Sequence, residues 1–409
     1  MNKHFSLRQV AAIVAVTLIV SVSVTAYAFY AAYNAQNRYI ISFDAERVNY
    51  ENVVKFKQVM NILKNDYYQD VDENKLLEGA ISGLAESLQD PYTVYFDKEQ
   101  MQSFLEKSQG SYVGIGVTVN VDDSGLLTVI EPFEGSPAQE AGMKQGDKIV
   151  KVDGTDVTAI SDENIIISMI KGEENTKVDI TVYRPSEDRY LQFKIKRKRI
   201  KTSNIKSEIL DNNIGYIKLV MFDSEIASYF KKDLNSMIKK GIEGLIIDLR
   251  DNPGGSYEQV VEIADSLLGE GTIVYTEDRN GKKEYKYSDR KKTDIPLVLL
   301  INGNSASASE ILAGAVKDHG RGKLIGTKTF GKGLVQELKL LQDGSGLKVT
   351  ISKYYTPSGV CIHGTGIKPD IEVDTLDEYR NLPVSQIPRD RDIQLQSAVE
   401  ALLGEINNN

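Results

Sequence analysis

The sequence contains little of what a disulfide-stabilised or zinc-dependent protein needs. It has one cysteine, Cys361, so no disulfide can form within a single chain. Its three histidines are His4, His319 and His363, and His4 precedes an apolar segment near the N-terminus. Two remaining histidines without paired cysteines argue against a zinc site. We therefore expect any hydrolytic chemistry to proceed without a metal or another cofactor.

Basic residues are in the minority. The formal net charge is −9 at pH 7, with 49 Lys and Arg against 58 Asp and Glu. A protein that binds a phosphate backbone needs an excess of positive charge on its binding surface. The composition therefore predicts no nucleic-acid partner.

Charged residues are absent from residues 10–33. As a helix this run would be roughly 36 Å long, which is enough to cross a bilayer. Lys3 and Arg8 precede it, so the positive-inside rule places the N-terminus inside the cell. A signal peptide cleaved after Ala26-Tyr27-Ala28 is the alternative, but the apolar run continues beyond that point. We expect an uncleaved single-pass anchor in a bacterial cell membrane, with the catalytic part extracytoplasmic.

The pattern of apolar residues changes twice along the chain, which is long enough for several domains. Residues 45–108 have apolar residues at steps of three and four, typical of helices. Short strands with glycine turns follow, and from about residue 205 strands and helices alternate as in α/β layers. We expect a mixed α/β and α+β multidomain chain with these segments: tail and membrane anchor 1–34, helical arm 35–110, β-rich domain 111–198, α/β core 199–375 (with part of 90–110), and C-terminal helical tail 376–409.

The segment 296–336 is the most informative. A buried strand at 297–301 precedes a serine–alanine run and a helix from about 307 to 318. Ser307 at such a turn lies at the positive end of the helix dipole, where free N–H groups can hold a developing oxyanion. The run from Ser307 to Glu310 also matches a capping box, in which both side chains only satisfy free N–H groups. Spacing alone leaves both interpretations open.

Two familiar motifs are incomplete in this segment. Residues 303–307 lack the final glycine of the nucleophile elbow of α/β-hydrolases. Residues 326–333 resemble a phosphate-binding loop, but Gly333 replaces the hydroxyl residue that would bind magnesium. The following residues alternate as a strand where that loop requires a helix. Nucleotide binding is therefore not expected.

A serine nucleophile needs a base, and the sequence offers His319, His363 or a lysine. Lys332 lies between two glycines at the entrance of a strand. It could act as a base if burial lowered its pKa by about 3 units from about 10.4. Alternation along the strand would place Gln336 on the same side as Lys332. A solvated hairpin lysine remains the alternative.

A second glycine-rich turn follows the buried strand at 245–249. Free amides of Gly254 and Gly255 at the start of the next helix suit an oxyanion or an extended peptide. Tight turns between a strand and a helix also need glycines, so this signal is weak by itself.

Seven segments together resemble the C-terminal processing peptidases, also called tail-specific proteases. They occur in the family's order, within roughly residues 50–375, and read YVGIG, SPAQEAGMKQGDKIVKVDG, GYIKL, LIIDLRDNPGG, NGNSASASEILAGAVKD, GTKTFGKGLVQ and TPSGVCIHGTGIKPD. The resemblance implies site residues with these roles: nucleophile Ser307, general base Lys332, third triad member Gln336, oxyanion hole Ala308 and Gly254, and supporting residues Glu310 and Arg250.

The resemblance also implies the architecture and the partners. Residues 111–198 look like a PDZ domain, with Val113, Gly114, Ile115 and Gly116 in the loop that captures a peptide C-terminus. The core would be ClpP/crotonase-like, and the PDZ domain would gate it. Protein or peptide substrates would bind through their C-terminal segments. A homodimer with contacts in 45–100 and 380–405 is expected.

Two other functions fit parts of the same sequence. The chain could be a non-catalytic receptor whose PDZ segment binds peptide tails, and an exposed Lys332 far from Ser307 would favour that interpretation. It could also be a Ser–His hydrolase, which would require His319 or His363 to approach Ser307.

Overall fold

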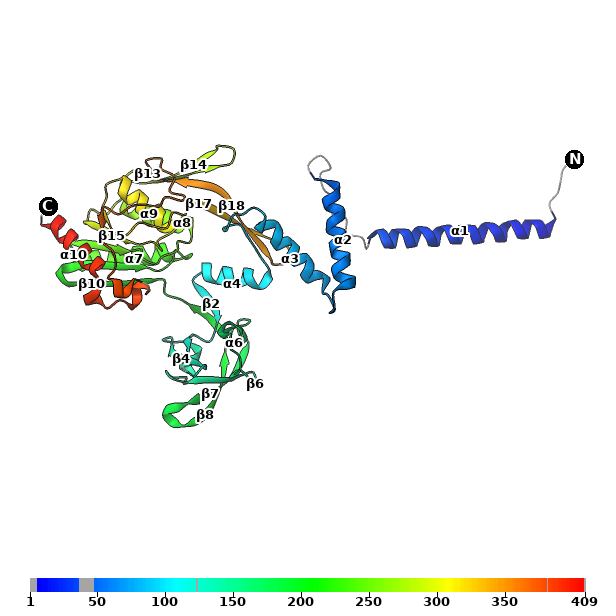
Figure 1. The fold of residues 1–409 in the computed structure, drawn as a ribbon, viewed down its shortest axis with the longest axis horizontal. Helices are drawn as coiled ribbons and strands as arrows, with labels where there is room; N and C mark the ends of the chain where they lie inside the picture. The colour runs from blue at the N-terminus through cyan, green and yellow to red at the C-terminus, as the bar shows by residue number, and fades with distance from the viewer. Residues whose placement is uncertain (1–5, 37–47, 123, 381, 408–409) are drawn as a thin grey trace. The chain divides into compact units, whose positions relative to one another are not determined.

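The computed structural model describes residues 6–36, 48–122, 124–380 and 382–407. The chain divides into two compact units, residues 1–79 and 80–409, each described by itself. In the first unit, helix α1 (Leu7–Gln36) contains a stretch of 25 residues, Leu7–Ala31, that is long and apolar enough to cross a membrane. Helix α2 (Tyr50–Asp66) begins at Asn49, whose side chain accepts a hydrogen bond from the N–H of Glu51. Helix α3 (Glu73–Glu86) runs across the boundary (Figure 1).

The second unit is built on a six-stranded sheet. In spatial order its strands are β10 (Ile205–Leu210), β11 (Ile214–Leu219), β12 (Gly244–Asp248), β15 (Leu297–Ile301), β16 (Lys323–Gly326) and β19 (Ile371–Glu372). Only β10 among these six runs antiparallel to its neighbour. Every residue of β12 and β15 is buried, as expected for parallel strands covered on both faces. The predicted strands at 214–219 and 297–301 are confirmed.

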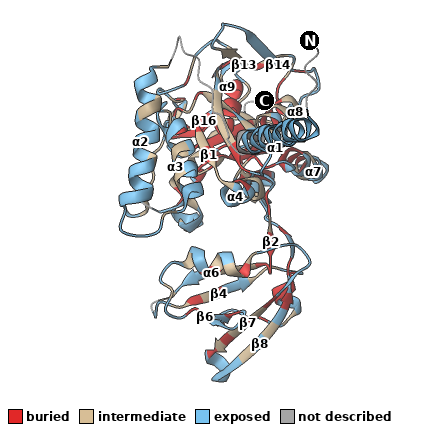
Figure 2. Cartoon of the chain, turned by 90° about the vertical axis from the view of Figure 1, so that its right-hand side faces the viewer, coloured by how far each residue is buried: buried red, intermediate tan, exposed pale blue. Residues whose placement is uncertain are grey.

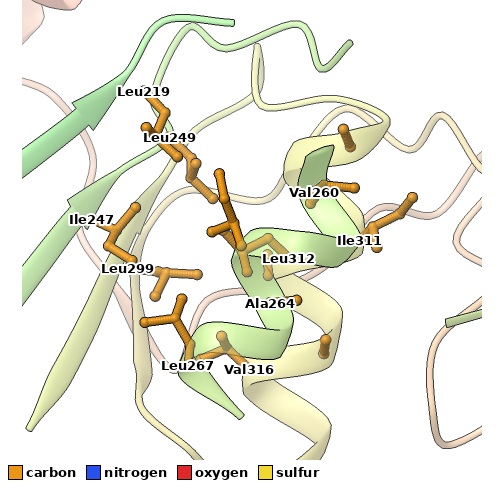
Figure 3. Close-up of a cluster of buried hydrophobic side chains, with 14 of the residues drawn as sticks. Leu219, Ile247, Leu249, Val260, Ala264, Leu267, Leu299, Ile311, Leu312 and Val316 are labelled. Atoms are coloured by element: carbon orange, nitrogen blue, oxygen red, sulfur yellow. The ribbon is translucent and has the colours of Figure 1, made fainter. Parts of the chain in front are cut away.

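Helices cover both faces of this sheet. Helices α7 (Ile226–Lys239), α8 (Tyr257–Leu267) and α9 (Ala308–Asp318) contribute to one apolar cluster, and Figure 3 shows Leu312 and Val316 of α9 facing Leu299 of β15. On the other face, helix α10 (Ile393–Ile406) buries Leu395, Ala398 and Leu402. Each fully buried apolar side chain stabilises the fold by about 1.5–3 kcal/mol. Figure 2 shows that buried residues are concentrated around α9.

A second sheet contains the strand that follows the loop of Lys332. Its strands are β1 (Val94–Phe96), β18 (Gly346–Tyr355), β13 (Gly271–Asp278) and β14 (Lys283–Ser288), with β17 (Leu334–Leu340) also paired to β18. Val94 lies opposite Lys348 across the β1–β18 ladder. Strand β1 departs from the helical pattern expected over residues 45–108. Its three residues pair with residues of β18 about 250 positions later in the chain. A local sequence pattern cannot reveal such a distant pairing.

Residues 98–201 hold a separate β-rich layer. Its sheet contains β3 (Val117–Val121), β4 (Leu127–Pro132), β5 (Lys148–Val152), β7 (Lys177–Arg184) and β8 (Arg189–Lys196), with β6 (Thr155–Asp156) paired to β5. Two helices, α5 (Pro137–Glu140) and α6 (Glu163–Ile170), pack on its apolar cluster. A two-stranded ribbon of β2 (Ser111–Gly114) and β9 (Lys198–Lys201) brackets this domain, and α4 (Lys98–Ser108) precedes it.

Candidate active site

Ser307 lies at the turn between β15 and α9, with an unusual backbone. Its φ is 54° and its ψ is −112°, a region that non-glycine residues rarely adopt. Such a conformation costs about 1–3 kcal/mol and persists only where the surroundings enforce it. The turn is fixed by Ser305, whose hydroxyl donates to the Leu249 carbonyl (2.8 Å) and accepts from the Asn302 N–H (2.9 Å). The half-buried Ser307 side chain is thus presented on a rigid turn.

Glu310 connects this turn to the loop of Lys332. The residue is fully buried, and its Oε2 accepts from the N–H of Ser307 (3.0 Å) and from the N–H of Lys332 (2.8 Å). Its Oε1 accepts from the Thr329 hydroxyl (2.6 Å) and the Gly331 N–H (2.7 Å). The Glu310 half of the expected capping box is therefore present, but the same carboxylate also holds the second loop. A single buried side chain fixes the backbones of Ser307 and Lys332 relative to each other.

Tyr354 makes a second connection that the sequence did not reveal. Its hydroxyl lies 3.0 Å from the carbonyl oxygen of Ser307 and within hydrogen-bond distance of the carbonyl oxygen of Lys332. The side chain is 1% exposed, and burial raises the pKa of Tyr354 well above its usual value. The hydroxyl therefore stays protonated and available as a donor. The pair Tyr354-Tyr355 in the strand pattern gave no sign of which ring faces inward.

The environment of Lys332 makes the neutral amine more accessible than in an ordinary lysine. Burial lowers the pKa of Lys332 to about 8, and the nearby Lys348 ammonium acts in the same direction, whereas the Asp90 and Glu310 carboxylates oppose the change. The Nζ atom lies 4.5 Å from the centre of the Tyr92 ring. Among the described residues, no hydrogen bond joins this amine to Ser307 or to Gln336. The side chain is half-buried, unlike the exposed lysine expected for a receptor.

Gln336 lies on β17, the strand that follows the loop of Lys332, and contacts Thr350. Its Nε2 lies 3.4 Å from the hydroxyl of Thr350, its partner on β18. The β17–β18 register shifts between Val335 and Gln336. Simple alternation from Lys332 to Gln336 is therefore interrupted by this irregularity.

The two residues expected to form the oxyanion hole lie next to each other. A Cβ atom on Gly254 would fall 2.8 Å from the Ser307 Cβ and 2.9 Å from the Ala308 nitrogen, so only glycine fits at this position, where φ is +101°. The Gly254 N–H donates to the Asn252 Oδ1 (2.9 Å). The Ala308 N–H has no hydrogen-bond acceptor among the residues that the structure describes.

Arg250 helps to hold the turn that carries Gly254. Its buried guanidinium binds Asp248 (2.7 Å), Asp392 (2.7 Å) and Gln394 (3.1 Å). The neighbouring Asp251 accepts from the Val384 N–H (2.8 Å). The turn that carries Gly254 is therefore bound to the start of α10 and the segment before it.

His319 and His363, the two alternative candidates for the base, lie in different parts of the structure. His319 follows the C-terminal end of α9, whereas Ser307 precedes its N-terminal end, so the two lie roughly 18 Å apart along the helix. The Nε2 of His319 instead lies 2.7 Å from the Thr272 carbonyl. A Ser307–His319 arrangement is therefore wrong. His363 is exposed, and its backbone runs beside Gly333, where an added Cβ would lie 2.6 Å from the His363 nitrogen.

The four residues expected to bind a peptide C-terminus are distributed over a strand and a turn. Val113 and Gly114 belong to β2 and lie opposite Arg199 and Lys198 of β9. Ile115 and Gly116 follow, and their carbonyl groups accept from the N–H groups of Ala138 (2.9 Å) and Phe133 (2.9 Å). The adjoining β3 is an edge strand of its sheet.

The chain is similar to known proteins over most of its length. A profile of peptidase family S41 matches residues 213–373, a PDZ-domain profile matches residues 113–196, and a profile of the activating protease CtpB N-terminal domain matches residues 19–100. The chain is 39% identical over 331 residues to the carboxy-terminal processing protease CtpA of Bacillus subtilis (strain 168), which covers 80% of this chain and 70% of that protein. It is 36% identical over 371 residues to a probable CtpA-like serine protease of Staphylococcus aureus (strain COL), covering 90% and 73%.

A solved structure supports the same fold. The putative S41 protease from Bacteroides fragilis NCTC 9343 aligns with a TM-score of 0.50 and 16% identity, over 90% of this chain and 99% of that one. Fold and relatives together define a serine-type peptidase that carries a PDZ domain. The chain belongs to peptidase family S41, and its homologues are carboxy-terminal processing proteases.

Proposed function

We propose that the chain is an extracytoplasmic endopeptidase in which Ser307 is the nucleophile, Lys332 the general base and Gln336 the third member of the triad. The observation that carries this proposal is the Glu310 carboxylate, which holds the backbone N–H groups of Ser307 and Lys332 on one oxygen atom. Two loops that are 25 residues apart in sequence are joined at these two residues. A scaffold or receptor has no need of that connection.

The chemistry follows from the ionisation of the lysine. With a pKa of about 8, roughly one Lys332 amine in ten is neutral at pH 7, compared with about one in 2,500 for an ordinary lysine. The neutral amine takes the proton of the Ser307 hydroxyl as the oxygen attacks the peptide carbonyl, and then gives it to the leaving nitrogen. The resulting acyl-enzyme is hydrolysed by water in the second half of the reaction. No step requires a metal or a cofactor.

The oxyanion would be stabilised by backbone N–H groups. Ala308 contributes an N–H that is not bound to another described residue, at the positive end of α9. Gly254 contributes the second once its N–H exchanges the Asn252 oxygen for the substrate oxygen. Arg250 supports that turn through Asp392 without touching Ser307.

The PDZ domain is proposed to select substrates and to gate the site. The peptide would add as a strand along the open edge of β3, with its terminal carboxylate at the turn of Ile115 and Gly116. Val113 and Gly114 would shape this turn from β2. Unstructured C-terminal segments of extracytoplasmic or membrane-tethered proteins suit such an edge.

The remaining organisation is proposed on the same basis. Helix α1 acts as a single-pass signal anchor, with the segment boundaries at residues 34, 110, 198 and 375 given above and a ClpP/crotonase-like core. A homodimer would use 45–100 and 380–405. Because Leu395, Ala398 and Leu402 are buried in the chain's own core, the opposite side of α10 would face the partner.

The test is cleavage of casein by the full-length chain in detergent. Ser307→Ala and Lys332→Ala are each expected to abolish cleavage, whereas Lys328→Ala, an exposed lysine on the same loop, is expected to leave it unchanged. A chelator should have no effect. If Lys332→Ala still cleaves casein while Ser307→Ala does not, the assigned base is disproved. His363 would then be the next candidate for the base. A wild-type chain that binds C-terminal peptides but cleaves nothing would support the receptor interpretation.

A further inference from the structure

The loop between α3 and β1 brings an aromatic ring to the amine of Lys332. The Lys332 Nζ lies 4.5 Å from the centre of the Tyr92 ring, within the range of a cation–π contact. These residues are 240 positions apart in the sequence. The half-buried Tyr92 thus comes from outside the core segment of residues 199–375.

Hydrogen bonds hold Tyr92 in this place. The Asp90 carboxylate accepts from the Tyr92 N–H (3.0 Å) and from the Thr93 hydroxyl (2.7 Å). The Thr93 oxygen in turn accepts from the N–H of Thr350 on β18 (3.1 Å), and Thr350 is also the contact of Gln336. The same short loop therefore contacts both Lys332 and, through Thr350, Gln336.

The charged groups around Lys332 come from several elements. Lys348 on β18 favours the neutral amine, while Asp90 in the loop and Glu310 on α9 favour the ammonium. Burial raises the pKa of Asp90, but hydrogen bonds from the hydroxyls of Thr350 and Thr93 and the charge of His363 outweigh it, so this carboxylate stays ionised at neutral pH. Asp90 and Glu310 make hydrogen bonds to other groups, whereas the Tyr92 ring lies in cation–π contact with the Lys332 amine.

We propose that Tyr92 is a positioning residue that holds the protonated amine of Lys332 over its ring and releases the neutral amine to Ser307. A ring quadrupole attracts an ammonium ion but not a neutral amine, so the contact weakens when the proton leaves. The freed amine can then accept the hydrogen bond from the Ser307 hydroxyl. This inference rests on the proposed role of Lys332 as the base, and it adds a residue from the N-terminal arm to that role.

Loss of the ring should lower the pKa of Lys332, because the protonated form loses its partner. Cation–π contacts are weaker at exposed sites than at desolvated ones. This range of strengths corresponds to a decrease in the pKa of Lys332 of roughly 0.4 to 1.5 pH units. The acid limb of kcat/KM would move down by the same amount, and cleavage at pH 7 would rise by about two- to eight-fold. The rate on the plateau above pH 9 would change little.

The direct experiment measures the titration of Lys332 without relying on activity. Acetylation of Lys332 by acetic anhydride is followed by mass spectrometry against pH, in the full-length Ser307→Ala chain in detergent. Tyr92→Leu is expected to lower the midpoint, and Tyr92→Phe to leave it in place because the ring remains. Tyr287→Leu, at an exposed tyrosine on β14, is the control and should have no effect.

A fluorinated series removes the risk that Tyr92→Leu fails to fold. Phenylalanine with one, two or three fluorine atoms at position 92 keeps the shape of the ring and weakens its quadrupole stepwise. The Lys332 midpoint should fall with each fluorine, and a midpoint that stays constant along the series overturns the proposal.

The outcomes separate this inference from the proposed function. A midpoint that falls in the Ser307→Ala background, together with a chain with Ser307 intact that cleaves nothing, supports the contact and contradicts the function. Cleavage that depends on Ser307 and Lys332, with an unchanged midpoint in every Tyr92 variant, supports the function and refutes the role of Tyr92.

Discussion

The two halves of the site are built differently. Ser307 follows β15, which is buried along its whole length, and precedes α9, in which Ala308 through Val316 are buried. Lys332 lies in the loop between β16 and β17, in which Lys328 and Phe330 are exposed, and the register of β17 shifts between Val335 and Gln336. The proposed nucleophile is thus fixed by packing, whereas the proposed base is placed by a few polar contacts. We expect that Ser307 keeps its place when the surroundings of Lys332 are changed.

Glu310 and Tyr354 are the places where the two halves meet. Their contacts reach the backbone atoms of Ser307 and Lys332 rather than the reactive atoms. The comparison therefore predicts that changes at these two residues affect catalysis strongly, whereas changes around the lysine amine alter its pH dependence. The following variants test this difference, from the largest expected effect to the smallest.

Glu310→Gln should weaken the connection between the Ser307 turn and the Lys332 loop. The amide replaces an oxygen that accepts two hydrogen bonds with an NH2 group that faces donors, so about 2–4 kcal/mol of stability is expected to be lost. Chemical denaturation measures this loss, and kcat/KM should fall on the order of 100-fold. Glu337→Gln, on the exposed side of β17, is the control. A stable Glu310→Gln variant with full activity would contradict the linking role.

Tyr354→Phe removes only the hydroxyl. The partly buried carbonyl groups of Ser307 and Lys332 lose a donor, and a cost of about 1–1.5 kcal/mol is expected. We expect kcat to fall roughly five- to ten-fold with KM almost unchanged, as steady-state kinetics would show. A change confined to KM would show that the hydroxyl acts on substrate binding instead.

Ser307→Gly tests whether the nucleophile turn is strained. Glycine accepts a φ of 54° without the steric cost that alanine retains, so Ser307→Gly should be about 1 kcal/mol more stable than Ser307→Ala. Both variants lack the hydroxyl, which makes them a matched pair. Equal unfolding midpoints in urea would mean that the turn carries no strain.

Lys348→Met should affect only the part of the candidate site around Lys332. Removal of the like charge raises the pKa of Lys332 above about 8, so the acid limb of kcat/KM moves to higher pH by a few tenths of a unit. Below that limb, activity falls about ten-fold per pH unit, because the protonated amine cannot accept a proton. Lys339→Met, exposed on β17, is the control. A shift of the limb to lower pH would reverse the assigned sign.

The sequence predicted those parts of the molecule that depend on neighbouring residues. The apolar runs at 245–249 and 297–301 indicated buried strands because both faces of a parallel sheet are covered. The turn at Ser307 followed from the strand-to-helix change, and the resemblance to a family identified Ser307 and Lys332 as a pair. These residues stand in motifs whose order along the chain is itself informative.

Contacts between distant segments could not be predicted in the same way. The pairing of β1 with β18, the approach of Tyr92 to Lys332 and the inward direction of Tyr354 each depend on a fold that brings remote residues together. The register shift at Gln336 and the hydrogen bond of the Gly254 N–H are local, but they arise from the packing of neighbouring strands and turns. Periodicity carries no information about either.

The ion pair between Arg250 and Asp392 has a consequence for biosynthesis. The turn that carries Gly254 is held by Asp392, Gln394 and the N–H of Val384, all of which follow Ser307 and Lys332 in the sequence. A growing chain therefore contains Ser307 and Lys332 long before it contains the residues that hold that turn. The order of synthesis therefore delays the completion of the candidate site until these later residues have been made.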